Sequence, residues 1–536
     1  MVRKTTWSTA FCYGGLMFAR LERKGFWRGT DYLERPLFLA ARARQAWLDR
    51  KCPCAEQQKL LPTLLEAASG TRFGRHYNFT ELARSGNACF TRFSQEIPIR
   101  GYDAFRLEWF ERFSEGYQLD NVTWPGAVRW FCETSGTTAG SKRIPFTDAM
   151  FRMNRRAALD MLSWYAATPG KAQALSGRIL YMAGSTSLTN LDAGIASGDM
   201  SAITLVHRPA WLAGRVLPQE PLSSSPWQQR LEGMASLLIH DQQIRVISGV
   251  PPWILLLLHE VEKQSGRPCR EVLSHLRLII HGGTSMTPYR SDFQRMLPGD
   301  GVDYLELLPS SESFMGYQRF GDCAMRLAPW YGTFFEFAPA DQIGSDGVLP
   351  PHARTVPLWG VSPGIRYAMV LTTCSGLWRY HIGDTIQFLD TSAYRFVFTG
   401  RTRSLETFEE KVTQLEVEQA IARLEREFQL TISEYMVGPS VEERRHIWFL
   451  SADGPLPDDK ATSACLDREL QEQNDDYCTF RRQERIHEPH IIFVPTEKLY
   501  AWSHHVRGKL GGQSKIPRID PDGGSFVESL RAFLAA

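Results

Sequence analysis

Two stretches of this 536-residue chain combine a short apolar strand, a turn and a helix, and this alternation limits the possible folds more than any other feature. Residues 277–297 read RLIIHGGTSMTPYRSDFQRML, with a Gly-Gly turn between the expected strand and helix. Residues 245–264 read RVISGVPPWILLLLHEVEKQ and repeat the pattern. Strands that alternate with helices are typical of α/β layers, so we expect an α/β fold with a largely parallel sheet.

The chain changes character near residue 400. Residues 1 to about 120 read as mostly helical, and residues 55–69 place apolar side chains three and four positions apart. Residues 367–390 read as two strands joined by a turn. After residue 400 we expect a helix at 414–428, strands at 431–438 and 446–453, a helix at 466–475, a strand at 490–495 and a polar tail. We therefore predict a large N-terminal α/β domain at residues 1–400 and a small α+β C-terminal domain at residues 401–536.

The composition excludes several classes of partner. Lys plus Arg is 61 and Asp plus Glu is 59, so the charge balance predicts neither nucleic acid nor an anionic membrane as partner. The longest apolar run, WILLLLH at residues 253–259, is far shorter than a membrane span. Of ten cysteines only Cys52 and Cys54 are close, and no second pair completes a zinc site. Free thiols favour a reducing compartment, so we expect a cytoplasmic protein; nothing in the sequence indicates an oligomeric state.

One loop has the composition of a phosphate site. Residues 131–142 read FCETSGTTAGSK, rich in glycine and hydroxyl groups and ending in lysine. The spacing does not match the Walker A motif, which excludes a P-loop hydrolase. Glycines let the backbone approach phosphate oxygens, and hydroxyl and amide groups donate to them, although a polar surface turn stays possible. The candidate residues are Thr134, Ser135, Gly136, Thr137, Thr138 and Lys142.

Further motifs follow this loop in a fixed order. They are LELLPSSESF at residues 305–314, TTCSGLWRYHIGD at 372–384, FTGRTRSLETFEEKVTQLEVEQAI at 398–421 and GKLGGQSKIPR at 508–518. From about residue 50 to the C-terminus, the chain resembles the auxin-responsive Gretchen Hagen family of acyl-acid amido synthetases, in its bacterial-type form. That family belongs to the adenylate-forming superfamily.

The resemblance implies an activity and its reactants. The family adenylates a carboxylic acid with ATP and Mg²⁺, releasing pyrophosphate, and then transfers the acyl group to an amine, usually of an amino acid. It implies a large N-terminal domain of adenylate-forming type and a small mobile C-terminal domain. Small-molecule acids and amines are therefore the expected partners.

The resemblance also assigns roles to residues at the phosphates. Ser135, Thr137, Thr138 and Lys142 would hold the β- and γ-phosphates of ATP. Glu312, which follows Ser311, would lie beside the phosphates and bind the metal, since carboxylates are ordinary Mg²⁺ ligands.

Other roles concern the nucleoside. The turn formed by His281, Gly282, Gly283 and Thr284 would border the adenine, although a Gly pair is also ordinary α/β punctuation. Asp384 would accept from the ribose hydroxyls, unless it caps a turn. Arg401 would lie at the domain hinge and reach the ribose or a phosphate.

Lys515 is the principal catalytic candidate by resemblance. A lysine on the C-terminal domain would approach the acid carboxylate and the α-phosphate, where a cation stabilises the charge of the transition state. The amine must be neutral to attack, and His504 and His505 are candidates for the base. Arg379 would pair with an acidic neighbour or a phosphate.

The sequence departs from the family pattern at three positions. Leu308 stands near a usual aromatic residue that stacks on adenine, and Ser313 and Glu409 stand where the family prefers glycine. Two rival functions therefore stay open. The acyl group could pass to coenzyme A or to a carrier-protein thiol, or the protein could bind a nucleotide without catalysing a reaction.

Overall fold

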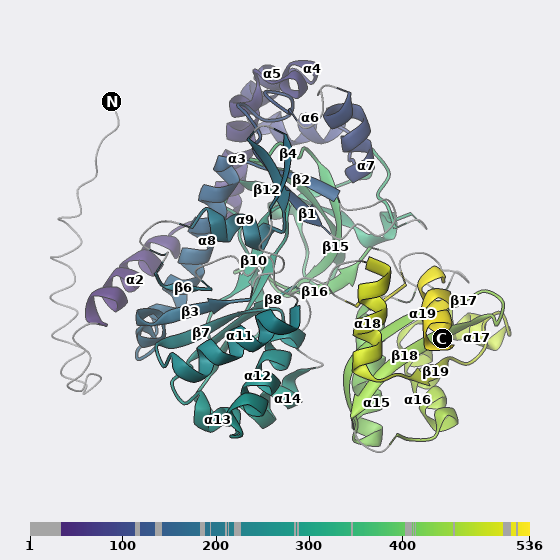
Figure 1. Ribbon diagram of the computed structural model, residues 1–536. Coiled ribbons are helices and arrows are strands. Elements are labelled where there is room, and N and C mark those ends of the chain that lie inside the picture. The colour runs from purple at the N-terminus through teal and green to yellow at the C-terminus, as the bar shows by residue number, and fades with distance from the viewer. Residues whose placement is uncertain are drawn as a thin grey trace.

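The chain forms two regions that share no sheet, the first with two sheets and the second with one (Figure 1). The computed structural model describes residues 34–112, 118–134, 142–182, 188–192, 194–208, 212, 214–218, 227–283, 286, 289–344, 347–402, 410, 412, 414–453, 456–507, 516–520 and 524–535. We call residues 34–402 the N-terminal region and residues 410–535 the C-terminal region. No helix among these residues is long and apolar enough to cross a membrane.

The N-terminal region begins with helices, as predicted. They are α2 (Arg35–Leu48), α3 (Pro53–Ala68), α4 (Arg72–His76), α5 (Phe79–Arg84), α6 (Cys89–Glu96) and α7 (Tyr102–Phe105), followed by a π-helical turn at Arg106–Glu111. Pro53 occupies the first position of α3, where a missing N–H costs no hydrogen bond. The Thr71 side chain caps α4 by accepting from the Gly74 amide.

A 12-stranded sheet runs through the N-terminal region in the order β13-β12-β14-β15-β16-β11-β10-β9-β8-β7-β3-β6. The strands are β3 (Arg178–Tyr181), β6 (Val216–Leu217), β7 (Ile244–Gly249), β8 (Leu278–Gly282), β9 (Asp303–Pro309), β10 (Phe314–Gln318), β11 (Met325–Leu327), β12 (Thr333–Pro339), β13 (Val356–Pro357), β14 (Arg366–Thr373), β15 (Tyr380–Phe388) and β16 (Arg395–Arg401).

The expectation of a largely parallel sheet is correct for only one part. Strands β6, β3, β7, β8 and β9 pair in parallel, and the two strand–helix units of the sequence are β7–α12 (Pro251–Ser265) and β8–α14 (Arg290–Met296). The expectation is wrong from β9 onward, where every pairing is antiparallel. Short connections join β9, β10 and β11, and likewise β14, β15 and β16. They allow only antiparallel neighbours, because a parallel crossover needs a dozen or more residues.

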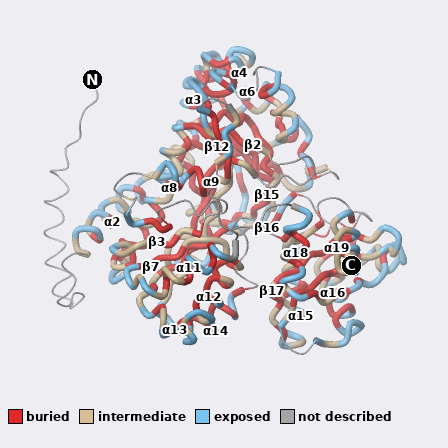
Figure 2. The backbone as a smooth tube through the Cα atoms, viewed as in Figure 1, coloured by how far each residue is buried: buried red, intermediate tan, exposed pale blue. Residues whose placement is uncertain are grey.

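Helices cover both faces of the parallel part, which explains its continuous apolar strands. Ile279 points into a core shared with α11 (Trp227–His240) and α12, whereas its neighbours Leu278 and Ile280 point into a core shared with α8 (Asp148–Ala166). Shorter helices in this region are α9 (Met200–Val206) and α13 (Cys269–Val272). Figure 2 shows buried and half-buried positions along these strands, and buried, half-buried and exposed positions along the helices that cover them.

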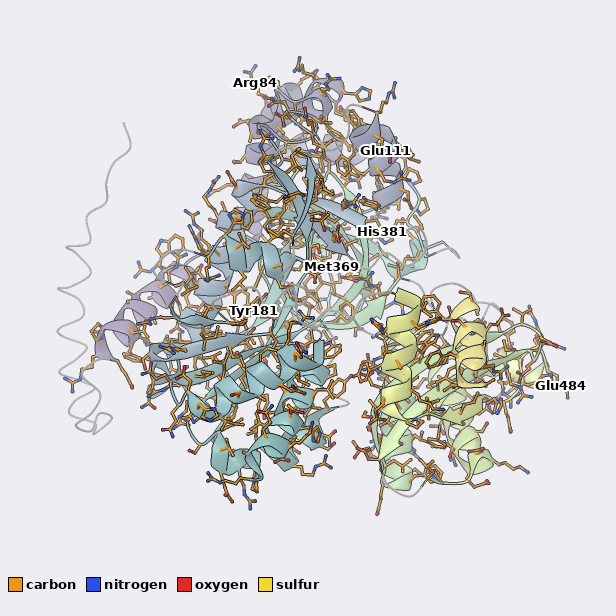
Figure 3. The ribbon with its side chains drawn as sticks, in the orientation of Figure 1. Arg84, Glu111, Tyr181, Met369, His381 and Glu484 are labelled. Carbon is orange, nitrogen blue, oxygen red and sulfur yellow. The ribbon has the colours of Figure 1, made fainter. Side chains whose placement is uncertain are left out.

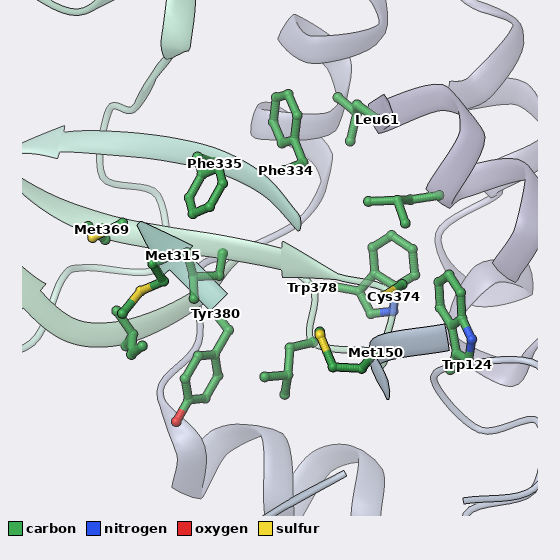
Figure 4. Packing of buried hydrophobic residues seen from close by; sticks show 14 of the residues in the cluster. Leu61, Trp124, Met150, Met315, Phe334, Phe335, Met369, Cys374, Trp378 and Tyr380 are labelled. Carbon is green, nitrogen blue, oxygen red and sulfur yellow. The ribbon is translucent and has the colours of Figure 1, made fainter. Parts of the chain in front are cut away.

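A second, four-stranded sheet contains both ends of the candidate phosphate-binding stretch at residues 131–142, which we call the phosphate-type loop. Its order is β2-β1-β5-β4, with β1 (Trp130–Thr134), β2 (Lys142–Phe146), β4 (Thr189–Asp192) and β5 (Ile195–Gly198). It packs into the largest core, which also contains the first helices and the antiparallel strands. Figure 4 shows part of this core, including Leu61, Phe334 and Trp378.

The C-terminal region is a three-stranded sheet with helices on both faces. Its elements are α15 (Gln414–Phe428), β17 (Thr431–Ser440), β18 (Arg445–Asp453), α16 (Asp459–Gln473), α17 (Asp475–Arg482), β19 (His490–Phe493), α18 (Thr496–Arg507) and α19 (Ser525–Ala535). Alternate residues of β18 face opposite cores: Trp448 packs with α15 and α16, and Phe449 packs with α18 and α19. The α+β prediction is confirmed, but the polar tail is wrong, since α18 and α19 occupy much of it.

The two regions meet at a short link. Strand β16 ends at Arg401 and α15 begins at Gln414. The domain boundary at residues 400–401 stays a prediction, as do the domain ranges 1–400 and 401–536. Glu484 marks the outer end of the C-terminal region in Figure 3, far from the labelled residues of the N-terminal region.

Candidate active site

Four of the predicted site residues influence one another electrostatically. Glu312 lies between β9 and β10 and is 7% exposed. Burial raises the pKa of its carboxyl, the negative charge of Asp384 raises it further, and the cations Arg401 and Lys142 lower it. Residues from four separate strands or turns therefore share one electrostatic environment.

The phosphate-type loop connects the ends of a regular hairpin. β1 and β2 are antiparallel, and Thr134 pairs with Lys142 at the end of the ladder where the loop connects the two strands. Ser135, Gly136, Thr137 and Thr138 lie outside the described residues. The register therefore fixes where the loop leaves and rejoins the sheet.

Tyr102 fixes the far end of this loop, and sequence reasoning missed it. Its hydroxyl accepts from the Arg143 amide at 2.9 Å, directly after Lys142. The Lys142 ammonium lies 5.9 Å from the centre of the Tyr102 ring. Tyr102 belongs to α7, so this helix holds the lysine end of the loop in place.

A tight turn presents Glu312. The Ser310 amide donates to the Ser313 carbonyl at 2.9 Å, and the Ser313 amide donates to the Ser310 hydroxyl at 3.1 Å. Ser311 is half-buried in this turn. The Ser313 hydroxyl is 2.6 Å from that of Thr333 on β12, so the serine at this position has a hydrogen-bond partner inside the fold.

Leu308 belongs to β9, four residues before Glu312. It is partly buried and packs against the largest core. It pairs with Gly316 of β10, whose hydrogen side faces the Phe396 ring so closely that a Cβ would lie 2.6 Å from it. The strand is therefore held in place by core packing at this position.

The Gly282-Gly283 pair is required by the backbone. A Cβ on Gly282 would lie 2.3 Å from the Leu307 carbonyl oxygen of β9, so only glycine lets the two strands approach. Gly283 has φ +81°, the left-handed region that glycine adopts without strain, and it is exposed. Thr284 lies outside the described residues.

His281 ends β8 beside this pair. It is 4% exposed, and burial lowers its pKa to about 4, with a further contribution from Arg290. Its Nδ1 atom has no hydrogen-bond partner in the described part of the chain. A neutral imidazole with an unused ring nitrogen is a candidate to bind a polar ligand.

Asp384 and Arg401 face each other across β15 and β16. They are register partners, and Arg401 Nε lies 3.0 Å from Asp384 Oδ1. The Asp384 side chain is 7% exposed and that of Arg401 is 64% exposed. The adjacent carboxylate raises the pKa of Arg401. His381, on the same strand as Asp384, lies near the side of the N-terminal region that faces the C-terminal region (Figure 3).

Tyr380 is a second residue that sequence reasoning missed. It lies in the GLWRYHIGD motif, four residues before Asp384, and is 1% exposed. Burial raises the pKa of its hydroxyl and the negative charge of Glu312 raises it further, so the hydroxyl stays protonated and can donate. Its position in a quoted motif was the signal that could have identified it.

Arg379 has an acidic partner. Its guanidinium Nε donates to Glu336 Oε1 at 3.0 Å, and both side chains are fully buried. Its remaining nitrogens donate to the Ser94 and Ile97 carbonyl oxygens and to the Thr355 hydroxyl. Arg379 therefore holds the N-terminal helices to β12, and the phosphate alternative does not apply.

The remaining candidates lie in the C-terminal region. Lys515 and Glu409 are outside the described residues, but residues 516–520 beside Lys515 are described. The Val437 amide donates to the Arg518 carbonyl at 3.0 Å, which fixes this segment on β17. His504 and His505 are exposed on α18.

A metal could bind here through few protein ligands. Among the described residues there is no group of three or more His, Cys, Asp or Glu side chains placed to hold a metal ion. Mg²⁺ usually binds one or two carboxylates together with substrate phosphates and waters. Glu312 alone therefore fits such a site, and its buried carboxylate would be stabilised by a cation.

Three family models match the chain. They describe the GH3 family N-terminal domain at residues 44–272, the GH3 family central domain at 327–401 and the GH3 family C-terminal domain at 415–522. Together they cover more than half of the chain. The first ends at the end of α13, the second ends at the end of β16 and the third begins within α15.

The chain is also similar to individual proteins whose names place them in the same family. Indole-3-acetic acid-amido synthetase GH3.10 of Arabidopsis thaliana is 27% identical over 261 residues, which are 44% of this chain and 43% of that protein. The match thus spans less than half the length of that relative. The structure of a GH3.15 acyl acid amido synthetase in complex with 2,4-DB has a TM-score of 0.75 at 16% identity, covering 92% of this chain and 96% of that one.

A more distant structure has the same fold. A 2-hydroxyisobutyryl-CoA ligase in the postadenylation state with 2-HIB-AMP has a TM-score of 0.57 at 13% identity, covering 90% of this chain and 92% of that one. The predicted fold, a large α/β region of adenylate-forming type with a separate C-terminal region, is therefore confirmed. With its three matching domain models, the chain belongs to the GH3 family.

Proposed function

We propose that this protein is an ATP-dependent acyl-acid amido synthetase, a ligase that forms an acyl-adenylate and then an amide. The observation that carries the proposal is the shared electrostatic environment of Glu312, Asp384, Arg401 and Lys142, in a chain with all three GH3 domains. The named relatives join acids to amines, which supports the same reaction class here.

The residues fit ATP and Mg²⁺ as reactants. The exposed Gly283, at the turn that follows the buried His281, would border the adenine. Glu312 would hold Mg²⁺, which neutralises charge on the β- and γ-phosphates when bound. Lys142 and the loop residues Thr134, Ser135, Gly136, Thr137 and Thr138 would hold the same phosphates.

In the first half-reaction a carboxylate oxygen of the acid attacks the α-phosphorus of ATP. A bond forms between that oxygen and phosphorus, and the bond from phosphorus to the bridging oxygen of pyrophosphate breaks. Asp384 would orient the ribose by accepting from its hydroxyls, and its partner Arg401 would hold that carboxylate in position. Lys515 would stabilise the charge on the α-phosphate.

In the second half-reaction a neutral amine attacks the acyl carbon. The carbon–nitrogen bond forms, the bond to AMP breaks, and the amine proton passes to a base. We propose an amino acid as the amine, as the resemblance of the sequence to acyl-acid amido synthetases implies. We also propose that residues 401–536 rotate as one domain between the two half-reactions, since the first takes place at the α-phosphorus and the second at the acyl carbon.

Several finer assignments belong to the same proposal. The unpaired thiols of the described cysteines support a cytoplasmic location. Ser311 would help to orient Glu312, and Thr284 would extend the nucleoside edge at Gly283. Ser313, whose hydroxyl is bonded to Thr333, would be compatible with activity because it is accommodated inside the turn.

Thioester formation is the second candidate. It is supported by the structural similarity to a 2-hydroxyisobutyryl-CoA ligase, at a TM-score of 0.57. The amido synthetase structure has the higher TM-score, 0.75, and all three GH3 domain models match. We therefore favour the amide product over the thioester.

The test is acid-dependent exchange between ATP and pyrophosphate. The panel comprises indole-3-acetic acid, 2,4-DB, 2-hydroxyisobutyrate and benzoate, each with Mg²⁺ and with or without an amino-acid mixture. We expect exchange with at least one acid and an amide only when the amine is present. Lys515→Ala should lower exchange by about 10²–10³-fold, whereas the control Lys498→Ala should not change it.

Other outcomes would point elsewhere. Exchange that leads to product only with coenzyme A would establish a thioester-forming ligase. ATP binding without exchange for any panel acid would favour the nucleotide-binding protein. Full activity in Lys515→Ala would remove Lys515 from the mechanism.

A further inference from the structure

A buried polar cluster joins the two regions, and the proposed mechanism does not use it. It consists of Tyr289, directly before α14, and of Glu434 on β17, Tyr500 on α18 and Arg518. Only Tyr289 comes from the N-terminal region. We call these four residues the interface cluster.

Hydrogen bonds connect all four members. Arg518 Nη1 donates to Glu434 Oε2 at 2.6 Å, and the Tyr500 hydroxyl donates to Glu434 Oε1 at 2.7 Å. The Tyr289 hydroxyl accepts from Arg518 Nη2 and lies 3.3 Å from Glu434 Oε1, to which it donates. The C-terminal region forms the Arg518–Glu434 ion pair by itself. Tyr289 of the N-terminal region adds a hydrogen bond to each member of that pair.

Apolar contacts surround these bonds. The Trp253 ring of α12 and the Tyr500 ring lie 5.5 Å apart between centres. Tyr500 also packs against the core that α11 and α12 share. The Arg518 guanidinium lies 4.3 Å from the centre of the Tyr435 ring. The interface thus combines packing of aromatic and apolar side chains with hydrogen bonds.

The cluster is largely shielded from water, with only Tyr500 and Arg518 partly exposed. Tyr289 is 1% exposed, and the side chains of Glu434 and Arg518 are 4% and 10% exposed. Burial raises the pKa of Tyr289, so its hydroxyl stays protonated and can donate and accept at the same time. Losing this hydroxyl would leave a buried cation and a buried carboxylate each short of a bond, which is costly.

Two members of the interface cluster are close in sequence to candidate active-site residues: Arg518 to Lys515, and Tyr289 to Gly283. Arg518 is three residues after Lys515, a span of at most ~11 Å. Ile516 is buried, and the Asp520 amide donates to the Val437 carbonyl at 2.8 Å, so the segment after Lys515 is held on β17. Tyr289 is six residues after Gly283, at the proposed nucleoside edge.

We propose that Tyr289 and Arg518 are positioning residues for adenylation: their contact holds the C-terminal region so that Lys515 reaches the α-phosphate. This inference rests on the proposed function. According to this inference, adenylation needs the arrangement in which Tyr289 contacts Arg518. The transfer of the acyl group to the amine does not need that contact.

The test compares two tyrosine variants of the full-length protein. Tyr289→Phe removes only the hydroxyl at the interface. Tyr317→Phe is the matched control, because Tyr317 is equally buried and its hydroxyl accepts from Trp164 Nε1 at 3.2 Å within the N-terminal region. We expect amide hydrogen exchange in α14 and α18 to become about tenfold faster in Tyr289→Phe only.

The kinetic readout separates positioning from stability. With the panel acid that gives the fastest wild-type exchange, Tyr289→Phe should lower the rate of ATP–pyrophosphate exchange about tenfold, with KM for ATP within about twofold. Amide formation from the preformed acyl-adenylate should stay within about twofold of wild type. A purely structural role would lower both rates together.

Several results would overturn the inference. Unchanged hydrogen exchange in α14 and α18 would show that the contact does not hold the regions together. Unchanged ATP–pyrophosphate exchange, or a loss confined to amide formation, would remove the contact from adenylation. A wild-type protein without exchange for any acid would overturn the proposed function and this kinetic role, while hydrogen exchange would still decide whether the contact docks the two regions.

Discussion

The described part of the chain contains two buried arginine–glutamate pairs in different settings. Arg379 and Glu336 are fully buried inside the N-terminal region, and Arg379 donates to two carbonyl oxygens and one hydroxyl besides the carboxylate. Arg518 and Glu434 are 10% and 4% exposed and share bonds with Tyr289 of the other region. The first pair is satisfied within one region, and the second is satisfied fully only when two regions meet.

The two arginines differ in the structural change that would expose each of them to water. Water can reach Arg379 only if the N-terminal region unfolds, because its partners come from the first helices and from β12. Its backbone has φ +47°, a left-handed conformation that persists only when surrounding contacts enforce it. Arg518 can be hydrated by separating the regions, with the rest of each region still folded.

The largest expected effect is at the first pair. Glu336→Ala leaves the Arg379 cation buried without its carboxylate, so we expect the free energy of unfolding of the N-terminal region to fall by about 3–5 kcal/mol. Urea unfolding followed by tryptophan fluorescence measures it. The control Glu271→Ala removes an exposed carboxylate and should change this free energy by less than about 0.5 kcal/mol. A loss below about 1 kcal/mol for Glu336→Ala would show that water reaches Arg379 in the folded protein.

A double-mutant cycle sharpens the comparison with an intermediate effect. Tyr289→Phe and Glu434→Gln alter one bonded cluster, so their effects on unfolding free energy should be coupled by about 0.5–3 kcal/mol. Tyr289→Phe and Glu336→Gln have no shared partner and should add within about 0.5 kcal/mol. Urea unfolding of the wild type, the three single variants and the two double variants gives both values. Additivity in the first cycle would contradict a contact between the regions.

Local sequence patterns predicted the elements whose periodicity is regular. The helix expected at 414–428 is α15 at the same residues, and the strand–turn–helix units became β7–α12 and β8–α14. The sheet direction after β9 was missed because strand patterns do not distinguish a hairpin from a crossover. The tail was called polar although Val527 and Leu530, three residues apart, already marked the buried face of α19.

Contacts between distant segments were beyond such patterns. Arg518 and Tyr289 are 229 residues apart, and neither has a local signal that names its partner. Asp384 and Arg401 were each predicted from motifs, but their pairing depends on the register of β15 and β16. Tyr102 was missed because its role is to bond the backbone next to Lys142, which no composition rule indicates.

The smallest expected effect concerns the pH dependence of the interface. Burial raises the pKa of Glu425 on α15 from 4.5 to about 7, the Ile432 amide lowers it, and Asp292 of α14, in the other region, raises it. The folded protein therefore keeps a proton on Glu425 between pH 4.5 and about 7, where the unfolded chain has lost it. Stability should fall as pH rises through this window, with the full cost present at pH 8.

Glu425→Gln removes this ionisation and keeps an oxygen that can accept from the Ile432 amide. Because Glu425 is only partly buried, solvent screening limits the cost of its charge to roughly 1 kcal/mol. We expect Tm to rise by about 1–2 °C at pH 8 and to stay unchanged at pH 4.5, measured by differential scanning calorimetry. The control Glu472→Gln on α16 alters an exposed carboxylate and should leave Tm unchanged at both pH values. An equal rise of Tm at both pH values would mean that the glutamine stabilises the protein through packing. Ionisation of Glu425 would then carry no cost at the interface, and this difference from the buried pair at Arg379 would disappear.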